Sequence, residues 1–294
     1  MSHVPVLLHE VIEGLKLKAG DTAVDATVGG GGYTRAIADV VGVKGTVIGF
    51  DQDGGTLSDA QKKLSDVPAT LHLVNENFRN LDRGLEKLGI SSIDAIAYDI
   101  GLSSLQLEES GRGFSFLRDE PLLMTFSEKP NEAAFTAKDI VNGWDEEDIA
   151  NVIFGYGEER YSRRIAKAIV EARKVKPFET AKELADLIEA LAGGRGAVHP
   201  ATKTFQALRI AVNDELKALS EGLEKGFAVL VPGGRMAVVS FHSLEDRIVK
   251  NFFRDKAKEG TSKLITKKPI TPSREEERDN PRSRSAKLRI LEKI

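Results

Sequence analysis

The stretch "VDATVGGGGYTRAI", residues 24–37, joins a short apolar run to an expected helix through four consecutive glycines. At such a turn the backbone N–H groups can come close to a ligand, because no Cβ stands in the way. An acidic residue, Asp25, ends the apolar run just before the glycines. The turn therefore indicates a site for a nucleotide-type ligand, although a tight turn with incidental glycines would give the same local pattern.

Two kinds of ligand use such a turn. A dinucleotide site needs G-x-G-x-x-G/A, and neither possible frame of the four glycines completes that pattern. S-adenosylmethionine sites instead have an acid before the glycines, and Asp25 could hold the amino group of the ligand directly or through water. A second acid, Asp51, ends the next strand and suits two ribose hydroxyls. We expect S-adenosylmethionine to bind with Gly31, Gly32 and Asp51 in contact.

The rest of the chain alternates strand with helix on both sides of a helical block. Apolar runs at 21–27, 45–51, 69–75 and 94–101 predict strands, with helical patterns between them. Residues 136–192 read as consecutive helices, and a long helix over 203–230 is followed by a strand at 233–242. A helix over 244–258 and two extended runs, 263–270 and 286–294, complete the chain.

This order predicts an α/β fold with a parallel sheet covered on both faces. We expect a sheet domain in two parts, residues 1–107 and 206–294, interrupted by a helical insertion over residues 108–205 on the substrate side. The second part carries a basic C-terminal stretch.

Composition excludes several chemistries. The 294 residues include no cysteine, which rules out disulfides, Cys-ligated zinc and any thiol nucleophile, and fits a reducing cytoplasm. The five histidines are scattered, so no metal is expected. Glu10 and Glu13 interrupt the N-terminal apolar run too early for a signal peptide or a membrane span.

A second polar cluster follows the strand expected at 94–101. Asp99 ends that strand, and the loop from Asp99 to Gln106 comes directly after it. Ligands of open α/β sheets lie beyond the carboxyl ends of the strands, at the point where strand order reverses. The loop is therefore expected to face the glycine turn, unless Asp99 is simply a helix N-cap.

Six motifs extend over nearly the whole chain and resemble one family. They are "HVPVLLHE" (3–10), "RGFSF" (112–116), "YGEERYSRRIAKAIV" (156–170), "HPATKTFQALRIAVNDEL" (199–216), "GGRMAVVSFHSLEDRIVK" (233–250) and "NPRSRSAKLRI" (280–290). Together they closely resemble the RsmH (MraW) family of S-adenosylmethionine-dependent methyltransferases. The resemblance implies methylation of N4 of a cytidine in the decoding region of bacterial small-subunit ribosomal RNA. It also implies a class I, Rossmann-like methyltransferase sheet with an inserted helical domain.

The resemblance also implies a set of cofactor-binding positions. An aromatic residue of the family's "NF" turn falls on Phe78 and is expected near the adenine, and Tyr33 replaces a residue that is usually His. The implied cofactor contacts are Gly31, Gly32, Tyr33, Asp51, Phe78, Asp99 and Gln106.

One segment departs from the family pattern. The family usually reads D-G-P-L-D-M-R-M after "RGFSF", whereas this chain has "RDEPLLMTF" at 118–126. Leu123 replaces an acid and Thr125 an arginine, so either the RNA-side pocket differs or the loop has drifted neutrally.

Methyl transfer to N4 needs an acceptor for the N4–H hydrogen bond, because the nitrogen lone pair is delocalised into the ring. Asp99, Ser240 and His242 are candidates, and the general base stays open among them. His242 has a second interpretation, as a residue that fixes the following turn. The absence of cysteine excludes the covalent route to C5 of cytosine.

Charge placement indicates where RNA could bind. The chain has a net charge of −3, but residues 263–289 carry nine Lys or Arg against four Asp or Glu. Two basic groups stand out, although each could be only a solvated face: Arg282, Arg284, Lys287 and Arg289 near the C-terminus, and Arg160, Arg163 and Arg164 in the insertion.

Two other functions are compatible with these patterns. A small-molecule methyltransferase would share the fold and cofactor without needing the basic stretch. A non-catalytic RNA-binding or assembly factor could keep the fold and lose the chemistry. The oligomeric state, and the choice between naked RNA and assembled subunit as substrate, stay open.

Overall fold

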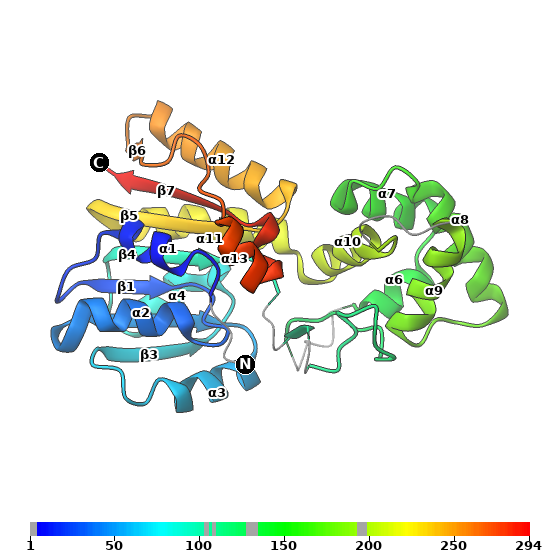
Figure 1. Cartoon of the computed structure of the whole chain (residues 1–294), viewed down its shortest axis with the longest axis horizontal. Coiled ribbons are helices and arrows are strands. Elements are labelled where there is room, and N and C mark those ends of the chain that lie inside the picture. The colour runs from blue at the N-terminus through cyan, green and yellow to red at the C-terminus, as the bar shows by residue number, and fades with distance from the viewer. Residues whose placement is uncertain (1–4, 103–105, 108–109, 128–134, 193–198) are drawn as a thin grey trace. The chain divides into compact units, whose positions relative to one another are not determined.

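The computed structural model describes residues 5–102, 106–107, 110–127, 135–192 and 199–294. The chain forms two compact units, which are considered separately. The sheet unit consists of Met1–Gly101 and Leu216–Ile294, and the helical unit consists of Leu102–Glu215. Figure 1 shows the strands in the first unit and the helices α6 to α10 in the second.

The sheet unit is built on a seven-stranded sheet in the order β3-β2-β1-β4-β5-β7-β6. Its strands are β1 (Thr22–Asp25), β2 (Thr46–Asp51), β3 (Thr70–Asn75), β4 (Ile93–Asp99), β5 (Leu230–Ser240), β6 (Ser262–Leu264) and β7 (Lys287–Lys293). The first five strands are parallel, and β7 is antiparallel to both of its neighbours. The chain adds β2 and β3 on one side of β1 and β4 on the other, so strand order reverses between β1 and β4.

Helices cover both faces of this sheet (Figure 1). One face packs against α1 (Leu8–Leu15), α2 (Gly32–Val41) and α3 (Gly54–Lys63), and the other against α4 (Leu81–Lys87), α11 (Glu215–Val229) and α12 (Ser243–Lys258). Successive strand residues point to opposite faces, so Ala23 joins the first core and Val24 the second. Both faces are buried, which explains why the central strands read as continuous apolar runs. The α/β fold class is confirmed.

Short elements complete the sheet unit. They are the 3-10 turns η1 (Gly42–Lys44), η2 (Phe78–Asn80) and η3 (Pro281–Ser285), and the helix α13 (Arg274–Asp279). The backbone N–H of Leu7 donates to Glu276 Oε1 at 2.7 Å, which ties the segment before α1 to α13.

The helical unit has one apolar core. Its helices are α6 (Ala137–Gly143), α7 (Glu146–Gly157), α8 (Ser162–Val175), α9 (Ala181–Ala192) and α10 (Thr202–Asn213). Each contributes apolar residues to a shared cluster that includes Ile140, Ile153, Ile169 and Leu208. Residues 136–192, all of which are described, carry no strand and only an isolated bridge from Thr180 to Pro121.

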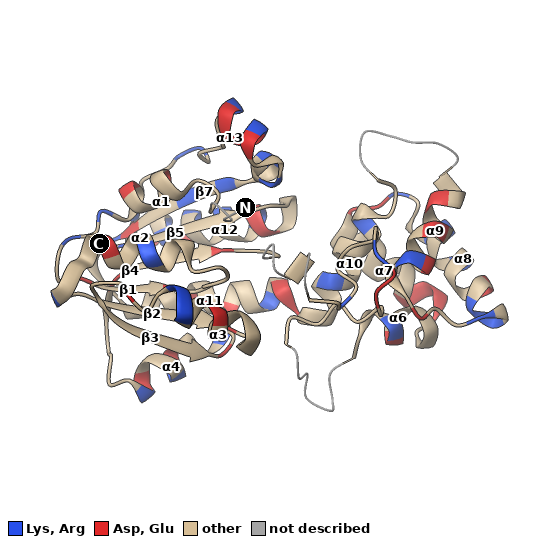
Figure 2. Ribbon diagram, turned by 60° about the horizontal axis from the view of Figure 1, so that its bottom comes forward, with Lys and Arg blue, Asp and Glu red and all other residues tan. Residues whose placement is uncertain are grey.

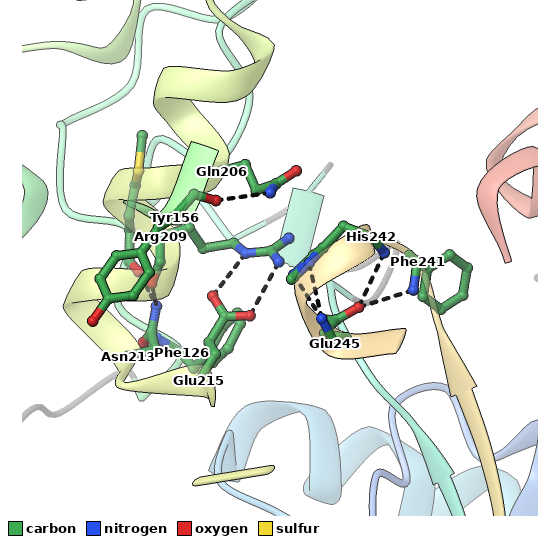
Figure 3. Close-up of polar contacts among 10 residues, drawn as sticks. Phe126, Tyr156, Gln206, Arg209, Asn213, Glu215, Phe241, His242 and Glu245 are labelled. Atoms are coloured by element: carbon green, nitrogen blue, oxygen red, sulfur yellow. Dashed lines mark hydrogen bonds and ion pairs between the residues drawn. The ribbon is translucent and has the colours of Figure 1, made fainter. Parts of the chain in front are cut away.

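The prediction of a single long helix over 203–230 is wrong. The chain leaves helical geometry at Asp214, which has φ 49°, and begins α11 at Glu215. The Asn213 side chain stabilises the break: its amide donates to the Met124 carbonyl, and its oxygen accepts from the Phe126 N–H (Figure 3). Because α10 packs into the helical core, the helical unit ends at Glu215 rather than at residue 205.

Candidate functional site

The glycine turn lies between the end of β1 and the start of α2. Gly29 and Gly31 have φ values of 49° and 86°, which disfavour residues with a Cβ. Gly31 is the N-cap of α2 and provides no side-chain hydrogen bond to its first turn. A Cβ added to Gly30 would meet no atom within 4 Å. The Gly29 and Gly31 N–H groups donate to Asp51 Oδ2 and to the Val28 carbonyl, so the turn offers a ligand its open side at Gly30 and the positive end of a helix.

Asp25 holds this turn together. Its side chain is 0% exposed, Oδ1 accepts from the Thr27 N–H at 3.1 Å, and Oδ2 accepts from the Thr34 hydroxyl at 2.6 Å. Burial raises the pKa of Asp25, opposed by the hydrogen bond from Thr34. Both oxygens of this buried side chain accept within the turn, so Asp25 fixes the geometry of the turn. Its contact with the amino group of the ligand, directly or through water, stays a prediction.

Asp51 lies at the end of β2 and reaches the same turn. Oδ2 accepts from the Gly29 N–H at 2.9 Å, and Oδ1 accepts from the Asp53 N–H at 2.9 Å. Burial raises the pKa of Asp51 to about 6, although these backbone hydrogen bonds act in the opposite direction. The side chain stays partly exposed, and each carboxylate oxygen has a further lone pair for a ligand hydroxyl.

Asp99 ends β4, across the strand-order reversal from β2. Its backbone N–H donates to the Thr27 hydroxyl at 2.8 Å, which links the end of β4 to the turn after β1. Its Oδ1 is buried and has no hydrogen-bond partner among the described residues. Burial, with the nearby negative charges of Asp25 and Glu245, raises the pKa of Asp99 to about 8. An orphaned acceptor among other carboxylates suits a cationic or hydrogen-bond-donating ligand.

Phe78 lies just beyond β3, at the start of η2. Its half-buried ring meets Tyr98 edge-on, with ring centroids 5.6 Å apart, and a Cβ added to Gly222 would lie 2.5 Å from it. Tyr98 is fixed in turn by donating to the Gly222 carbonyl at 2.7 Å. The ring is thus held near the carboxyl ends of the strands, as a flat apolar wall.

Tyr33 is buried rather than open. Its side chain is 4% exposed, and its hydroxyl donates to the carbonyl of Val6. Burial raises the pKa of Tyr33 well above its ordinary value. The ring therefore fixes the N-terminal segment against α2. The expected contact of Tyr33 with the cofactor stays a prediction.

His242 caps α12, which is the second of the two interpretations of this residue. Its Nδ1 accepts from the Glu245 N–H at 3.4 Å, while Glu245 Oε2 accepts from the backbone N–H groups of Phe241 and His242 (Figure 3). Glu245 is 1% exposed and was missed from the sequence. A polar residue followed three positions later by Glu is the capping-box spacing that could have revealed it. The third candidate, Ser240, is buried, with its hydroxyl 3.5 Å from the Lys287 carbonyl.

The helical unit contains the expected cofactor contact Gln106 and the two departures from the family pattern, Leu123 and Thr125. Gln106 is 8% exposed, and its carbonyl accepts from the Ser110 hydroxyl at 2.6 Å. Its contact with the cofactor stays a prediction. Of the two departures from the family pattern, Thr125 is buried and Leu123 is half-buried, in a segment that runs beside α6.

The basic C-terminal group divides into two pairs. Arg289 donates to Asp246 Oδ1 at 2.7 Å and Lys287 to Asp246 Oδ2 at 3.2 Å. Burial alone would raise the pKa of Asp246, but these hydrogen bonds hold it below its ordinary value. Arg289 is 8% exposed, so its ion pair locks β7 to α12 and leaves little of its side chain for a phosphate, whereas binding of phosphate by Lys287 stays a prediction. Arg282 and Arg284 are exposed.

The described helices include none that is both long and apolar enough to cross a membrane.

Comparison with known proteins identifies the family. The model of the MraW methylase family matches residues 1–294. A ribosomal RNA small subunit methyltransferase H of Heliobacterium modesticaldum is 46% identical over 311 aligned positions, covering 99% of this chain and 98% of the relative. The protein of the same name from Clostridioides difficile is 43% identical over 310 positions, covering 99% of each chain.

A solved structure supports the fold. The crystal structure of a candidate rRNA-methylase from Clostridium thermocellum matches with a TM-score of 0.51 at 16% identity, covering 99% of this chain and 100% of that one. Motifs, fold and whole-length similarity agree: this chain belongs to the MraW methylase family.

Proposed function

We propose that this protein transfers the methyl group of S-adenosylmethionine to N4 of a cytidine in the decoding region of small-subunit ribosomal RNA. The observation that carries the proposal is the site at the strand-order reversal, where the glycine turn, Asp51 and Asp99 converge in a member of a methylase family. Its relatives at 43% and 46% identity are small-subunit rRNA methyltransferases by name.

The charges of the site favour this cofactor over a dinucleotide. Asp25 is close enough for its charge to raise the pKa values of both Asp51 and Asp99. An anionic pyrophosphate would be repelled there, whereas an ammonium and a sulfonium would be attracted. Asp51 would accept from the ribose hydroxyls, Phe78 would line the adenine, and Gly31 and Gly32 would border the ligand. The expected contact from Gln106 is part of this proposal.

Asp99 is the proposed acceptor for the N4–H of the target cytosine. When bound, S-adenosylmethionine supplies an electrophilic methyl group on a sulfonium. The free Oδ1 of Asp99 can accept a hydrogen bond from the exocyclic amine and orient its lone pair for in-line attack. As the N–C bond forms and the C–S bond breaks, the amine loses one proton. Asp99 can take this proton in its ionised form, which the positive charge of the bound sulfonium favours by lowering the pKa of the carboxyl group. His242 and Glu245 then support the site by fixing the start of α12.

The substrate side of the proposal rests on charge. Arg282 and Arg284 are exposed in the sheet unit, and Arg160, Arg163 and Arg164 are exposed in the helical unit. Figure 2 colours Lys and Arg blue along both units. Phosphate contacts of this kind supply most of the affinity for RNA. Ribosomal RNA as the substrate places the reaction in the bacterial cytoplasm. The enzyme must also draw the target base out of its stack.

The test is methyl transfer to purified small subunits from cells that lack this gene. Labelled S-adenosylmethionine should mark the ribosomal RNA, and mass spectrometry should locate one N4-methylcytidine in the decoding region. Naked ribosomal RNA and a pool of small metabolites serve as parallel acceptors. Labelling of a metabolite instead would indicate a small-molecule methyltransferase. Failure of the protein to bind S-adenosylmethionine in a calorimetric titration would favour a non-catalytic RNA-binding factor.

A further inference from the structure

The helical unit contains a pocket that the site described above does not use. Its volume is about 370 Å³, which lies within the usual range for small-ligand pockets. The start of α8, the end of α9 and the start of α10 line it. Its walls combine apolar side chains from the helical core, including Ile165 and Ile188, with the polar residues Arg160, Tyr161 and Arg164.

The cations of this pocket differ in what they contact. Lys203 donates to the Glu158 carbonyl at 3.0 Å and lies 4.0 Å from Glu159, the acidic residue of the lining. That contact offsets the one negative charge there. Arg160 and Arg164 are exposed, and neither makes an ion pair or hydrogen bond with any described residue. Two guanidinium groups therefore remain available at the rim, and guanidinium binds phosphate in a bidentate manner.

An aromatic ring stands beside these arginines. Tyr161 is 63% exposed although it lies between the helices α7 and α8, where a large ring would normally be packed. Tyr161 is the N-cap of α8 but makes no side-chain capping hydrogen bond, so the described contacts give its ring no role in stabilising the start of the helix. Exposed aromatic rings next to arginines are the usual platform for stacking unpaired bases.

We propose that this pocket binds one nucleotide of single-stranded ribosomal RNA, with the base on Tyr161 and its phosphate on Arg160 and Arg164. The inference rests on the proposed function, which supplies an RNA substrate. It assigns to the helical unit a contact separate from the methyl-transfer site. Such a contact fits an enzyme that must hold its target base outside a regular stack, because it anchors a neighbouring unpaired nucleotide.

The test compares RNA binding by full-length variants. The double variant Arg160→Ala/Arg164→Ala should bind a short single-stranded oligoribonucleotide, and purified small subunits, at least about tenfold more weakly at moderate salt. Its log–log salt slope should be shallower by about 0.7, since the two arginines share one phosphate and each single-strand phosphate contact contributes about 0.7. Lys174→Ala is the matched control: this exposed cation lies on the same helix but does not line the pocket, so binding should change little.

The aromatic contact is tested separately. Tyr161→Ala should weaken binding at least about fivefold, and Tyr161→Phe, which keeps the ring, should bind like the wild type. Affinity for S-adenosylmethionine and the far-UV circular dichroism spectrum should be unchanged in every variant, and the spectrum shows that the helical unit is folded. Equal binding by the double variant and Lys174→Ala would overturn the proposal. So would equally effective competition by a phosphorylated peptide of matched charge, because the pocket would then be a general anion site.

The outcomes separate this proposal from the proposed function. A double variant that binds normally in an enzyme that methylates small subunits refutes the pocket alone. If the wild type methylates no ribosomal RNA, the proposed function is refuted. If the double variant Arg160→Ala/Arg164→Ala nevertheless binds the oligoribonucleotide more weakly than the wild type does, the pocket is supported.

Discussion

The affinity for S-adenosylmethionine should depend on pH through Asp51. Its pKa of about 6 means that the carboxylate is mostly ionised at pH 7 and mostly protonated at pH 5. Ribose hydroxyls donate to the charged form, so affinity is lost as pH falls through this pKa. With about one group in eleven still ionised at pH 5, the dissociation constant should rise by nearly tenfold between pH 7 and pH 5.

Asp99 and the ionisable groups of the ligand change charge little between pH 5 and pH 7. The pKa of about 8 for Asp99 leaves that group protonated throughout most of this range. The amino and carboxyl groups of the ligand have ordinary pKa values of about 8 and about 3.5, so their charges change little. Asp53 and Asp25 are the neighbouring carboxylates whose charges also act on Asp51.

The test variant is Asp51→Asn, whose affinity for S-adenosylmethionine is measured by isothermal titration calorimetry at several pH values. The wild-type carboxylate accepts hydrogen bonds from the backbone N–H groups of Gly29 and Asp53. In the variant, the side-chain NH2 group would face one of these N–H groups, and two donors cannot form a hydrogen bond. Loss of a charge-assisted acceptor should cost about 1.5–3 kcal/mol of binding free energy at pH 7. The remaining affinity should be nearly independent of pH. Asp59→Asn, an exposed carboxylate on α3, is the control and should keep the wild-type profile.

Either of two results would refute this reasoning. One is a flat wild-type profile between pH 7 and pH 5, and the other is an unchanged pH dependence in Asp51→Asn.

Three further outcomes are expected. Asp99→Ala should slow single-turnover methyl transfer by about 10²–10⁴ and leave RNA affinity within about twofold, measured by filter binding; normal transfer would remove Asp99 from the chemistry. Asp246→Ala leaves the mostly buried Arg289 uncompensated and should lower the free energy of unfolding by about 3 kcal/mol in urea titrations. The wild-type pair should weaken in acid, because the lowered pKa of Asp246 makes its contribution disappear as pH falls through that value. Arg282→Ala/Arg284→Ala should weaken RNA binding and shallow its salt slope without affecting the cofactor; wild-type binding at moderate salt would show that these arginines form only a solvated face.

Local pattern alone predicted the five parallel strands of this protein, whereas the antiparallel pairing of β7 with β5 and β6 was not predicted. Alternating strand and helix signals identified the parallel sheet, and the glycines after Asp25 located the turn at its carboxyl edge. Asp51 and Asp99 could be chosen because each ends a strand, and parallel strands bring such ends to one edge. These features depend on neighbours in sequence, which is why periodicity and turn chemistry reveal them.

Contacts between distant residues decided what individual side chains do. Tyr33 was expected only as a ligand contact, and the fold shows its hydroxyl on the carbonyl of Val6, 27 positions away. Arg289 looked like a phosphate ligand, but Asp246, 43 positions away, already holds it. The same basic or aromatic residue can bind a ligand or join the interior, and only burial and the partner across the fold determine which. Such partners leave no periodic trace in the sequence, because the pairing is set when the sheet and its helices pack together.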